Sequence, residues 1–347
     1  MKKRTIVSAL VLSALSVSMN NSFAADTKVS GFLRAAGAIS TGETPYLERI
    51  DRNGNAGDTH FGLNVSRDVT DNLQVAGQLW ASGAEGGTFE MMLDWAYASL
   101  RVAEGLSVNG GKIKYPNLIV SEYIDVGITY PWARPPQELY GFDVEGRPNM
   151  SLESFVGASM VYEGFAGDME YTLQAYGGEA GLEGEAGVSG GTLSKMLGAK
   201  FKFGTDVLNV HAAYNRHMPE GTIGELGAPA MKNGHTVTVL SAGAMMNWQN
   251  ILLMGEYATA SVADEVDENT TGLYGTVGYR IGSFMPHFTY AQLDAEEGRS
   301  SMTLGVKYQM SPVSTFKVDW AQITPDAEPG EEAESFGVAT VALDVVF

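Results

Sequence analysis

The chain has 347 residues, 22 basic and 41 acidic side chains, 42 glycines and no cysteine. A bundle of transmembrane helices is excluded, because it requires several runs of about 20 apolar residues and only residues 6–19 approach one. A net charge of −19 argues against nucleic acid as a partner, since phosphate binding requires a basic face. The absence of cysteine excludes a disulfide framework, and 44% hydrophobic residues are enough to build an ordered structure.

The first 24 residues have the pattern of a secretory signal peptide that is cleaved after Ala24. Residues 2–4 are Lys-Lys-Arg, residues 6–17 form a short apolar segment, and residues 22–24 are Ser-Phe-Ala. A retained membrane anchor is the less favoured reading, because the apolar run is too short to span comfortably. Removing the three basic residues leaves 19 basic against 41 acidic side chains, a net charge of −22. We therefore expect residues 25–347 to form a single exported domain.

Apolar residues recur at every second position along this domain, in segments of about ten residues. Residues 197–203 read Leu-Gly-Ala-Lys-Phe-Lys-Phe, and residues 302–308 and 316–320 follow the same alternation. A period of two predicts β-strands with one apolar face each. We expect sixteen strands, at 28–40, 59–67, 73–82, 90–102, 106–115, 152–162, 169–178, 194–203, 207–216, 235–246, 251–260, 271–281, 284–293, 300–309, 314–322 and 335–347.

The connections between these strands alternate between two lengths. Segments such as 68–72 and 204–206 are tight turns, whereas segments such as 41–57 and 217–234 are long and polar. An even number of antiparallel strands with short turns at one end and long loops at the other is typical of a bacterial outer-membrane barrel. The fold class expected is all-β, an antiparallel transmembrane barrel with short periplasmic turns, long extracellular loops and about 16 strands, with 18 left open.

Charged residues within the strands lie on the face opposite the apolar series. On the lipid-facing side of a barrel a Lys or Arg near the midplane costs about 2–4 kcal/mol, so charges are expected to avoid it. A soluble β-sandwich would show the same alternation, so the export signal, the strand number and the chain terminus decide for the membrane barrel. The charged residues on this polar face are Arg34, Lys200, Lys202, Glu256, Arg280, Lys307, Lys317, Asp319 and Asp344.

The last ten residues, 338–347, alternate apolar residues on one parity and close with Phe347. This ending resembles the C-terminal signature by which the barrel-assembly machinery recognises outer-membrane barrels. Combined with the alternation and the export signal, it supports a barrel that is inserted into the outer membrane of a Gram-negative bacterium.

The segment 116–150 breaks the strand pattern. It is about 35 residues long, far longer than an ordinary connection, and Pro131, Pro135 and Pro136 forbid a central strand there. The segment is also too apolar and aromatic for a loop surrounded by water. Because a wide barrel has a polar lumen with room for an inserted segment, we expect this third long loop to fold into the lumen.

At this point the chain resembles the Gram-negative porin superfamily. The resemblance is carried by residues 28–34 (Lys-Val-Ser-Gly-Phe-Leu-Arg), residues 95–100 (Trp-Ala-Tyr-Ala-Ser-Leu), the long third loop and Phe347. It implies a sixteen-stranded channel that assembles as a homotrimer and is narrowed by its third loop. The partners it implies are outer-membrane lipid and lipopolysaccharide, the barrel-assembly machinery and small hydrophilic solutes, without nucleic acid and without a cofactor.

The third loop departs from that family in sequence. The acidic Pro-Glu-Phe-Gly stretch of general porins is missing, and residues 130–136 read Tyr-Pro-Trp-Ala-Arg-Pro-Pro, with Trp132 and Arg134 in their middle. This difference leaves pore size and selectivity open.

The resemblance also implies a constriction in which acids of the loop face a basic strip on the wall. A bulge at Gly110-Gly111 would turn both Lys112 and Lys114 inward, although wall lysines that are solvated by lumen water are an equally good reading. The loop candidates are Glu122, Asp125, Glu138, Asp143 and Glu145, and the wall candidates are Arg34, Lys112, Lys114, Lys200, Arg280 and Lys307.

Two groups of aromatic residues have alternative readings. The loop aromatics could stack on sugars, but we favour packing of the loop against the inner wall; they are Tyr115, Tyr123, Tyr130, Trp132 and Tyr140. A second group lies on the lipid-facing parity and is typical of an interfacial girdle; it comprises Tyr97, Tyr214, Tyr257, Tyr279, Tyr290 and Trp320.

These observations predict a passive diffusion channel rather than an enzyme. The five histidines are scattered without metal-ligand spacing, and no catalytic constellation is evident. A net charge of −22 favours cations modestly at the channel mouth, although the basic wall residues oppose this preference. The alternatives are a substrate-specific channel for a sugar, carboxylate or phosphate and, less favoured, a soluble exported binding or adhesive protein.

Overall fold

The computed structural model describes residues 27–47, 49–83, 89, 91–141, 152–181, 191–220, 234–263, 269–295, 298–327 and 334–347. Within these residues, alternating sequence segments form sixteen strands. Their bounds are β1 (Thr27–Ser40), β2 (His60–Asp68), β3 (Leu73–Ser82), β4 (Met91–Ala103), β5 (Leu106–Lys114), β6 (Ser154–Ala166), β7 (Met169–Gly181), β8 (Thr192–Gly204), β9 (Leu208–Glu220), β10 (Val237–Trp248), β11 (Ile251–Val262), β12 (Thr270–Tyr279), β13 (Phe284–Asp294), β14 (Arg299–Ser311), β15 (Ser314–Pro325) and β16 (Phe336–Val346).

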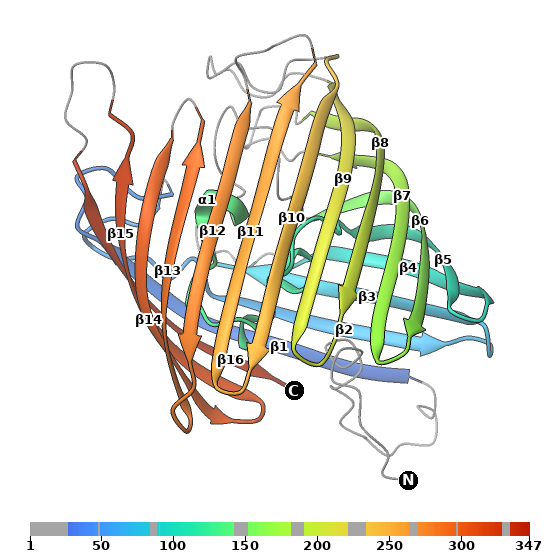
Figure 1. Ribbon diagram of the computed structural model, residues 1–347, viewed down its shortest axis with the longest axis horizontal. Helices are drawn as coiled ribbons and strands as arrows, with labels where there is room; N and C mark the ends of the chain where they lie inside the picture. Colours follow the sequence, from blue (N-terminus) through green and yellow to red (C-terminus); the bar gives the residue numbers. More distant parts are fainter. Residues whose placement is uncertain are drawn as a thin grey trace.

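The strands form one closed antiparallel barrel (Figure 1). Each strand pairs with its neighbours in sequence, and β1 pairs with β16, with Arg34 opposite Asp344, to close the cylinder. The tight turns, such as those after β8 and β10, lie at the same end of the barrel as the C-terminus, and the longer connections lie at the other end (Figure 1). The predicted all-β fold, its antiparallel pairing and the count of sixteen strands within the described residues are confirmed.

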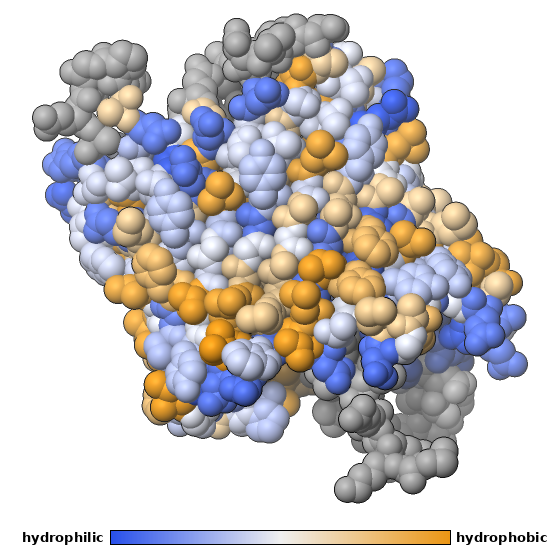
Figure 2. Space-filling model, viewed as in Figure 1, coloured by the Kyte–Doolittle hydropathy of each residue, from blue (hydrophilic) through white to orange (hydrophobic). Residues whose placement is uncertain are grey.

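The two faces of each strand differ as the alternation predicts. On β8, Leu197 and Phe201 are 49% and 41% exposed on the outside, whereas Lys200 between them is 2% exposed and points into the lumen. Figure 2 shows apolar side chains gathered in a band across the lower part of the visible face, with polar side chains above it. An apolar outer band around a polar interior is the arrangement expected of a barrel that spans a membrane.

A bulge in β4 changes which residues face the lumen. Gln78 pairs with Trp95 while the next residue of β3 pairs with Leu93, so Asp94 is the extra residue. Below the bulge, Tyr97 packs against a cluster of side chains inside the barrel. Its assignment to the lipid-facing girdle is therefore wrong, because the extra residue reverses the parity. The other girdle candidates keep the outward parity, with Tyr214, Tyr257, Tyr279 and Trp320 exposed and Tyr290 half-buried.

The third long connection enters the barrel. Residues 115–141 contain two 3-10 turns, η2 (Ser121–Tyr123) and η3 (Gly127–Thr129), and one short helix, α1 (Gln137–Tyr140), which lies behind β12 in Figure 1. Every residue in this stretch is buried or half-buried. Among the described residues, no helix has both the length and the apolar character to cross a membrane.

An apolar cluster holds the loop against the wall of the barrel. Leu118 and Trp132 of the loop are fully buried and pack with wall residues such as Val239 and Tyr274. The lumen of this barrel is therefore partly filled by a packed core, and the loop is part of that core.

Candidate functional site

The third loop makes hydrogen bonds to opposite walls of the barrel. On one side, His60 Nε2 of β2 lies 2.9 Å from the carbonyl oxygen of Asp125. On the other side, Ser241 Oγ of β10 donates to Asn117 Oδ1 at 2.9 Å. Since β2 and β10 are eight strands apart in a ring of sixteen, the loop crosses the lumen instead of following one wall.

Glu256 on β11 is one anchor of the loop. Its Oε1 accepts a hydrogen bond from the backbone N–H of Ile119 at 2.6 Å, and its Oε2 accepts from Tyr140 and from Tyr274, the latter at 2.8 Å. His211 Nε2 lies 2.9 Å from Oε1. The buried carboxylate is thus fully hydrogen-bonded, which is the condition under which a charge is tolerated inside a protein.

Trp132 lies at the centre of the packed loop. It has no exposed surface, and its indole N–H is directed at Thr276 Oγ1 and Thr289 Oγ1, 3.1 and 2.9 Å away. Its ring meets Tyr274 edge to face with centroids 5.3 Å apart. Tyr115, Tyr130 and Tyr140 are at most 3% exposed, and Tyr123 is half-buried. These rings pack against the wall, so the geometry favours the packing reading over a sugar track.

Lys317 on β15 is the most deeply buried lysine or arginine among the described residues. Its ammonium donates to the carbonyl oxygens of Gly127 and Trp132, the latter at 2.9 Å, and lies 3.0 Å from Asp344 Oδ2. It also sits 4.4 Å from the centre of the Tyr130 ring. The alternation predicts the inward orientation of Lys317, but the predicted constriction residues do not include it.

Two predicted wall residues, Arg34 and Lys307, lie beside Lys317 and also bind the loop. Arg34 Nη1 donates to Tyr130 Oη at 3.1 Å and pairs with Asp344 Oδ1 at 3.2 Å. Lys307 Nζ donates to the carbonyl oxygen of Ile128 at 2.5 Å. Both side chains face the lumen as predicted, and both hold the loop.

The predicted acids of the loop are paired with wall cations at contact distance. Glu122 Oε2 lies 2.5 Å from Lys202 Nζ and 3.4 Å from Lys200 Nζ, and Glu138 Oε1 lies 3.3 Å from Arg299 Nε. Lys200 also donates to a loop carbonyl oxygen, that of Leu118, at 2.8 Å. The charges of loop and wall therefore neutralise one another pairwise instead of facing each other across open water.

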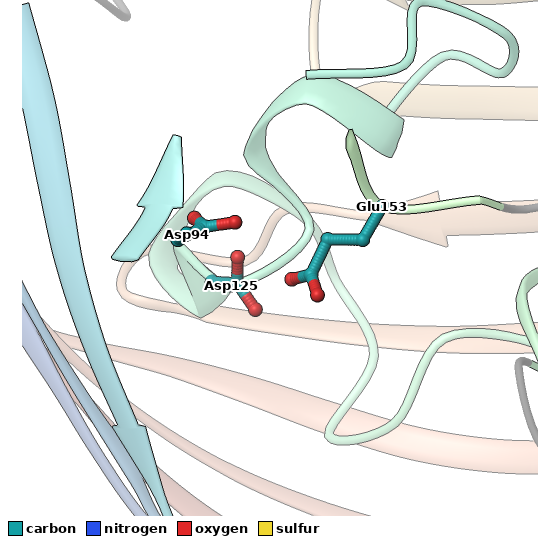
Figure 3. A group of neighbouring side chains, drawn as sticks. All are labelled: Asp94, Asp125 and Glu153. Atoms are coloured by element: carbon teal, nitrogen blue, oxygen red, sulfur yellow. The ribbon is translucent and has the colours of Figure 1, made fainter. Parts of the chain in front are cut away.

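Lys114 is surrounded by three acids. Its Nζ lies 2.9 Å from Asp94 Oδ1, 3.1 Å from Asp125 Oδ2 and 3.1 Å from Glu153 Oε1. Figure 3 shows the three carboxylates converging from different parts of the chain, and one oxygen of each lies within 4.8 Å of the others. The lysine ammonium compensates this cluster and ties the loop, β4 and the start of β6 together.

Arg134 links the third loop to the first one. It pairs with Asp58, which also binds Arg49 at 2.9 Å. Burial alone would raise the pKa of Asp58, but the two guanidinium groups outweigh it and lower the pKa to about 2. The stabilisation from this bridge is therefore complete above the ordinary aspartate pKa and is lost only as the pH falls through about 2.

The structure places two predicted wall residues elsewhere. Lys112 pairs with Val156, which is 55% exposed on the outer face, because β4 and β5 pair without a register shift at Gly111. The predicted bulge that would turn Lys112 inward is therefore wrong. Arg280 lies just after β12, where it is exposed and donates to Asn247 Oδ1 at 2.9 Å. Asp143 and Glu145 lie outside the described residues.

Phe347 closes the barrel through its backbone. Its carbonyl oxygen accepts from Gly31 N–H at 2.8 Å, and its N–H donates to Gly31 O at 3.0 Å. Its ring stacks on Phe61 with centroids 6.1 Å apart. Its role as an assembly signal stays a prediction.

Several residues that hold the loop are not among the site residues predicted from the sequence. Asp319 accepts from the N–H of Ala133 at 2.7 Å and lies 3.3 Å from His287. The inward parity of Asp319, Glu256 and Asp344 was visible in the sequence. Asp94 carried no such signal, because its orientation depends on the bulge.

The less buried part of the lumen follows β2 to β8. Inward-facing residues of β12, β13, β15 and β16 are buried beneath the loop, whereas many on β2 to β8 are half-buried. This wall carries a series of hydroxyl and amide groups, which includes Asn64, Ser66, Gln74, Ser99, Asn109, Thr172 and Gln174.

A closed sixteen-strand barrel with an apolar outer band and a loop folded into a polar lumen defines an outer-membrane channel. The model of the Gram-negative porin family matches residues 7–327, and the chain belongs to this family.

Three solved structures share the fold at low sequence identity. OmpF of Salmonella typhi, in complex with daunomycin, is 16% identical with a TM-score of 0.63, over 92% of this chain and 97% of that one. The anion-selective porin of Comamonas acidovorans is 14% identical with a TM-score of 0.63, over 92% and 99%. The trimer form of OmpT of Vibrio cholerae is 14% identical with a TM-score of 0.57, over 92% and 99%. No curated protein matches the chain in sequence.

Proposed function

We propose that the protein is a narrow, passive channel that lets small hydrophilic solutes and ions cross the outer membrane down their gradients. The observation that carries this proposal is the third loop, which is hydrogen-bonded to both β2 and β10 and so crosses the lumen. Solutes would pass beside the loop, along the half-buried wall of β2 to β8.

Ion preference in this proposal comes from the channel mouth and not from the constriction. The loop acids Glu122, Asp125 and Glu138 are each paired with wall cations. They therefore contribute little to the electric field along the path that solutes take beside the loop. The chain without residues 1–24 has a net charge of −22, which enriches cations at the entrance. A modest cation preference follows.

A substrate-specific channel is the second candidate. It is favoured by the crossing loop and by residues 130–136, whose Trp132 and Arg134 hold the loop to Thr289 and Asp58. A loop fixed this firmly leaves less room than one that lies along a single wall, and a narrow path can select among solutes.

Planar-bilayer recordings of the purified protein across a salt gradient test both readings. We expect a small, ohmic current and a reversal potential whose sign shows that cations permeate more readily than anions. The opposite sign, which would show that anions permeate more readily, would contradict the cation preference. Millimolar block by one class of solute would favour the specific channel, whereas a large current that no candidate solute blocks would exclude it.

The assembly and processing of the chain form part of the same proposal. We expect residues 1–24 to be removed on export, and three copies to associate in the outer membrane among lipid and lipopolysaccharide. The structural relative from Vibrio cholerae that is described as a trimer supports this stoichiometry, as does the position of Lys112 on an outer face among apolar residues, where lipid would be an unfavourable neighbour.

A further inference from the structure

Two aromatic side chains of β4 face the accessible part of the lumen. Trp95 and Tyr97 are both half-buried, and their rings lie 5.5 Å apart at 33°. They share the inward face because the bulge at Asp94 reverses the parity of β4. Unlike the four buried loop aromatics Tyr115, Tyr130, Trp132 and Tyr140, this pair therefore offers ring surface to a solute in the channel.

The indole N–H of Trp95 has no hydrogen-bond partner among the residues that the structure describes. By contrast, the N–H of the packed Trp132 lies within hydrogen-bond distance of two threonine hydroxyls. Since a Trp N–H usually finds a partner when it is buried, Trp95 is positioned to donate to a solute or to water in the lumen.

Polar side chains also face the accessible part of the lumen. Glu122 of the loop is 29% exposed, and its partner Lys202 on β8 is 42% exposed. Ser99 follows Tyr97 on the same face and pairs with Asn109 on β5. The accessible acid and base cancel in charge, so the site combines aromatic surface with neutral hydrogen-bonding capacity.

We propose that Trp95 and Tyr97 form a binding site for neutral saccharides inside the channel. A sugar ring presents C–H groups that pack on an aromatic face and hydroxyls that both donate and accept hydrogen bonds. The side-chain amide of Asn109 on the neighbouring strand supplies an acceptor, and the indole of Trp95 supplies a donor. Neither group is charged, and the Glu122–Lys202 ion pair that faces the same lumen is neutral as a whole, so the site favours a neutral solute over a carboxylate or phosphate.

This inference rests on the proposed channel function, and sucrose is the probe that tests it. In planar bilayers, sucrose at millimolar concentration should reduce the current of the wild-type channel, with glycerol as a control for viscosity. Trp95→Ala should raise the half-blocking concentration by about tenfold, and Trp95→Phe, which keeps an aromatic face, should restore most of the block. The matched control is Trp320→Ala on the outer face, where the residue is 46% exposed. Sucrose should block this variant at the same concentration as it blocks the wild-type channel.

The outcomes separate the two claims. Absence of any salt current in the wild type would contradict the channel itself. A normal salt current that sucrose does not reduce, or equal block of Trp95→Ala and Trp320→Ala, would overturn the saccharide site and leave the channel standing.

Discussion

Lys317→Met should raise the single-channel conductance severalfold. The ammonium of Lys317 on β15 donates to two carbonyl oxygens of the loop, those of Gly127 and Trp132. Methionine has a similar length but no donor, so both carbonyl groups would lose their buried partner at a cost of about 1–3 kcal/mol each. The loop would then leave the wall more often and widen the path.

The control for this variant is Lys28→Met. Lys28 is an exposed lysine near the start of β1 and pairs with Ser66 of β2. It makes no hydrogen bond or ion pair with the described residues of the third loop. Its removal should leave the conductance close to that of wild type, apart from a small change in ion preference. Equal conductance of Lys317→Met and wild type, with both folded in detergent, would show that Lys317 does not hold the loop.

Lys114→Met should destabilise the barrel strongly and make its stability dependent on divalent cations. Removing the lysine leaves Asp94, Asp125 and Glu153 unpaired within 4.8 Å of one another, and breaking a buried ion pair in this way costs about 3–5 kcal/mol. Three converging carboxylates suit calcium, which prefers oxygen ligands. Thermal unfolding in detergent should therefore show a lower midpoint that millimolar Ca²⁺ partly restores.

The matched control for the calcium effect is the double variant Lys114→Met with Asp94→Asn. It removes one carboxylate, so calcium should restore much less of the lost stability. If calcium stabilises wild type and Lys114→Met equally, or if Lys114→Met unfolds at the wild-type temperature, the role assigned to this cluster is wrong.

The barrel itself was predictable from the sequence because it follows from one local rule. Apolar residues on alternate positions identify the strands, and turn lengths identify the ends, so the expected bounds of β3 coincide with the observed ones and most others agree within a few residues. The inward orientation of Arg34, Lys200 and Lys307 followed from the same rule.

The errors arise where the rule fails locally. An extra residue at Asp94 turns Tyr97 inward, and regular pairing through Gly111 keeps Lys112 outside. Alternation cannot reveal a bulge, because the bulge depends on how the neighbouring strand pairs. The position of Arg280 depends on where β12 ends, which is set by the turn that follows.

The path of the loop could not be predicted either. The sequence showed that residues 116–150 do not form a strand, and their apolar character suggested insertion into the lumen. Which wall the loop touches depends on contacts between residues more than 100 positions apart, such as those of Ile119 with Glu256 and of Ala133 with Asp319. Such pairs have no signature in local sequence.

The size limit of the pore is the most direct test of a lumen crossed by the third loop. Single-channel conductance can be recorded with neutral polyethylene glycols of increasing size in the bath. We expect that only the smallest polymers reduce the conductance, and that the size limit shifts to larger polymers in Lys317→Met. A wild-type channel that admits large polymers, as an unobstructed sixteen-strand barrel would, would show that the third loop does not cross the lumen.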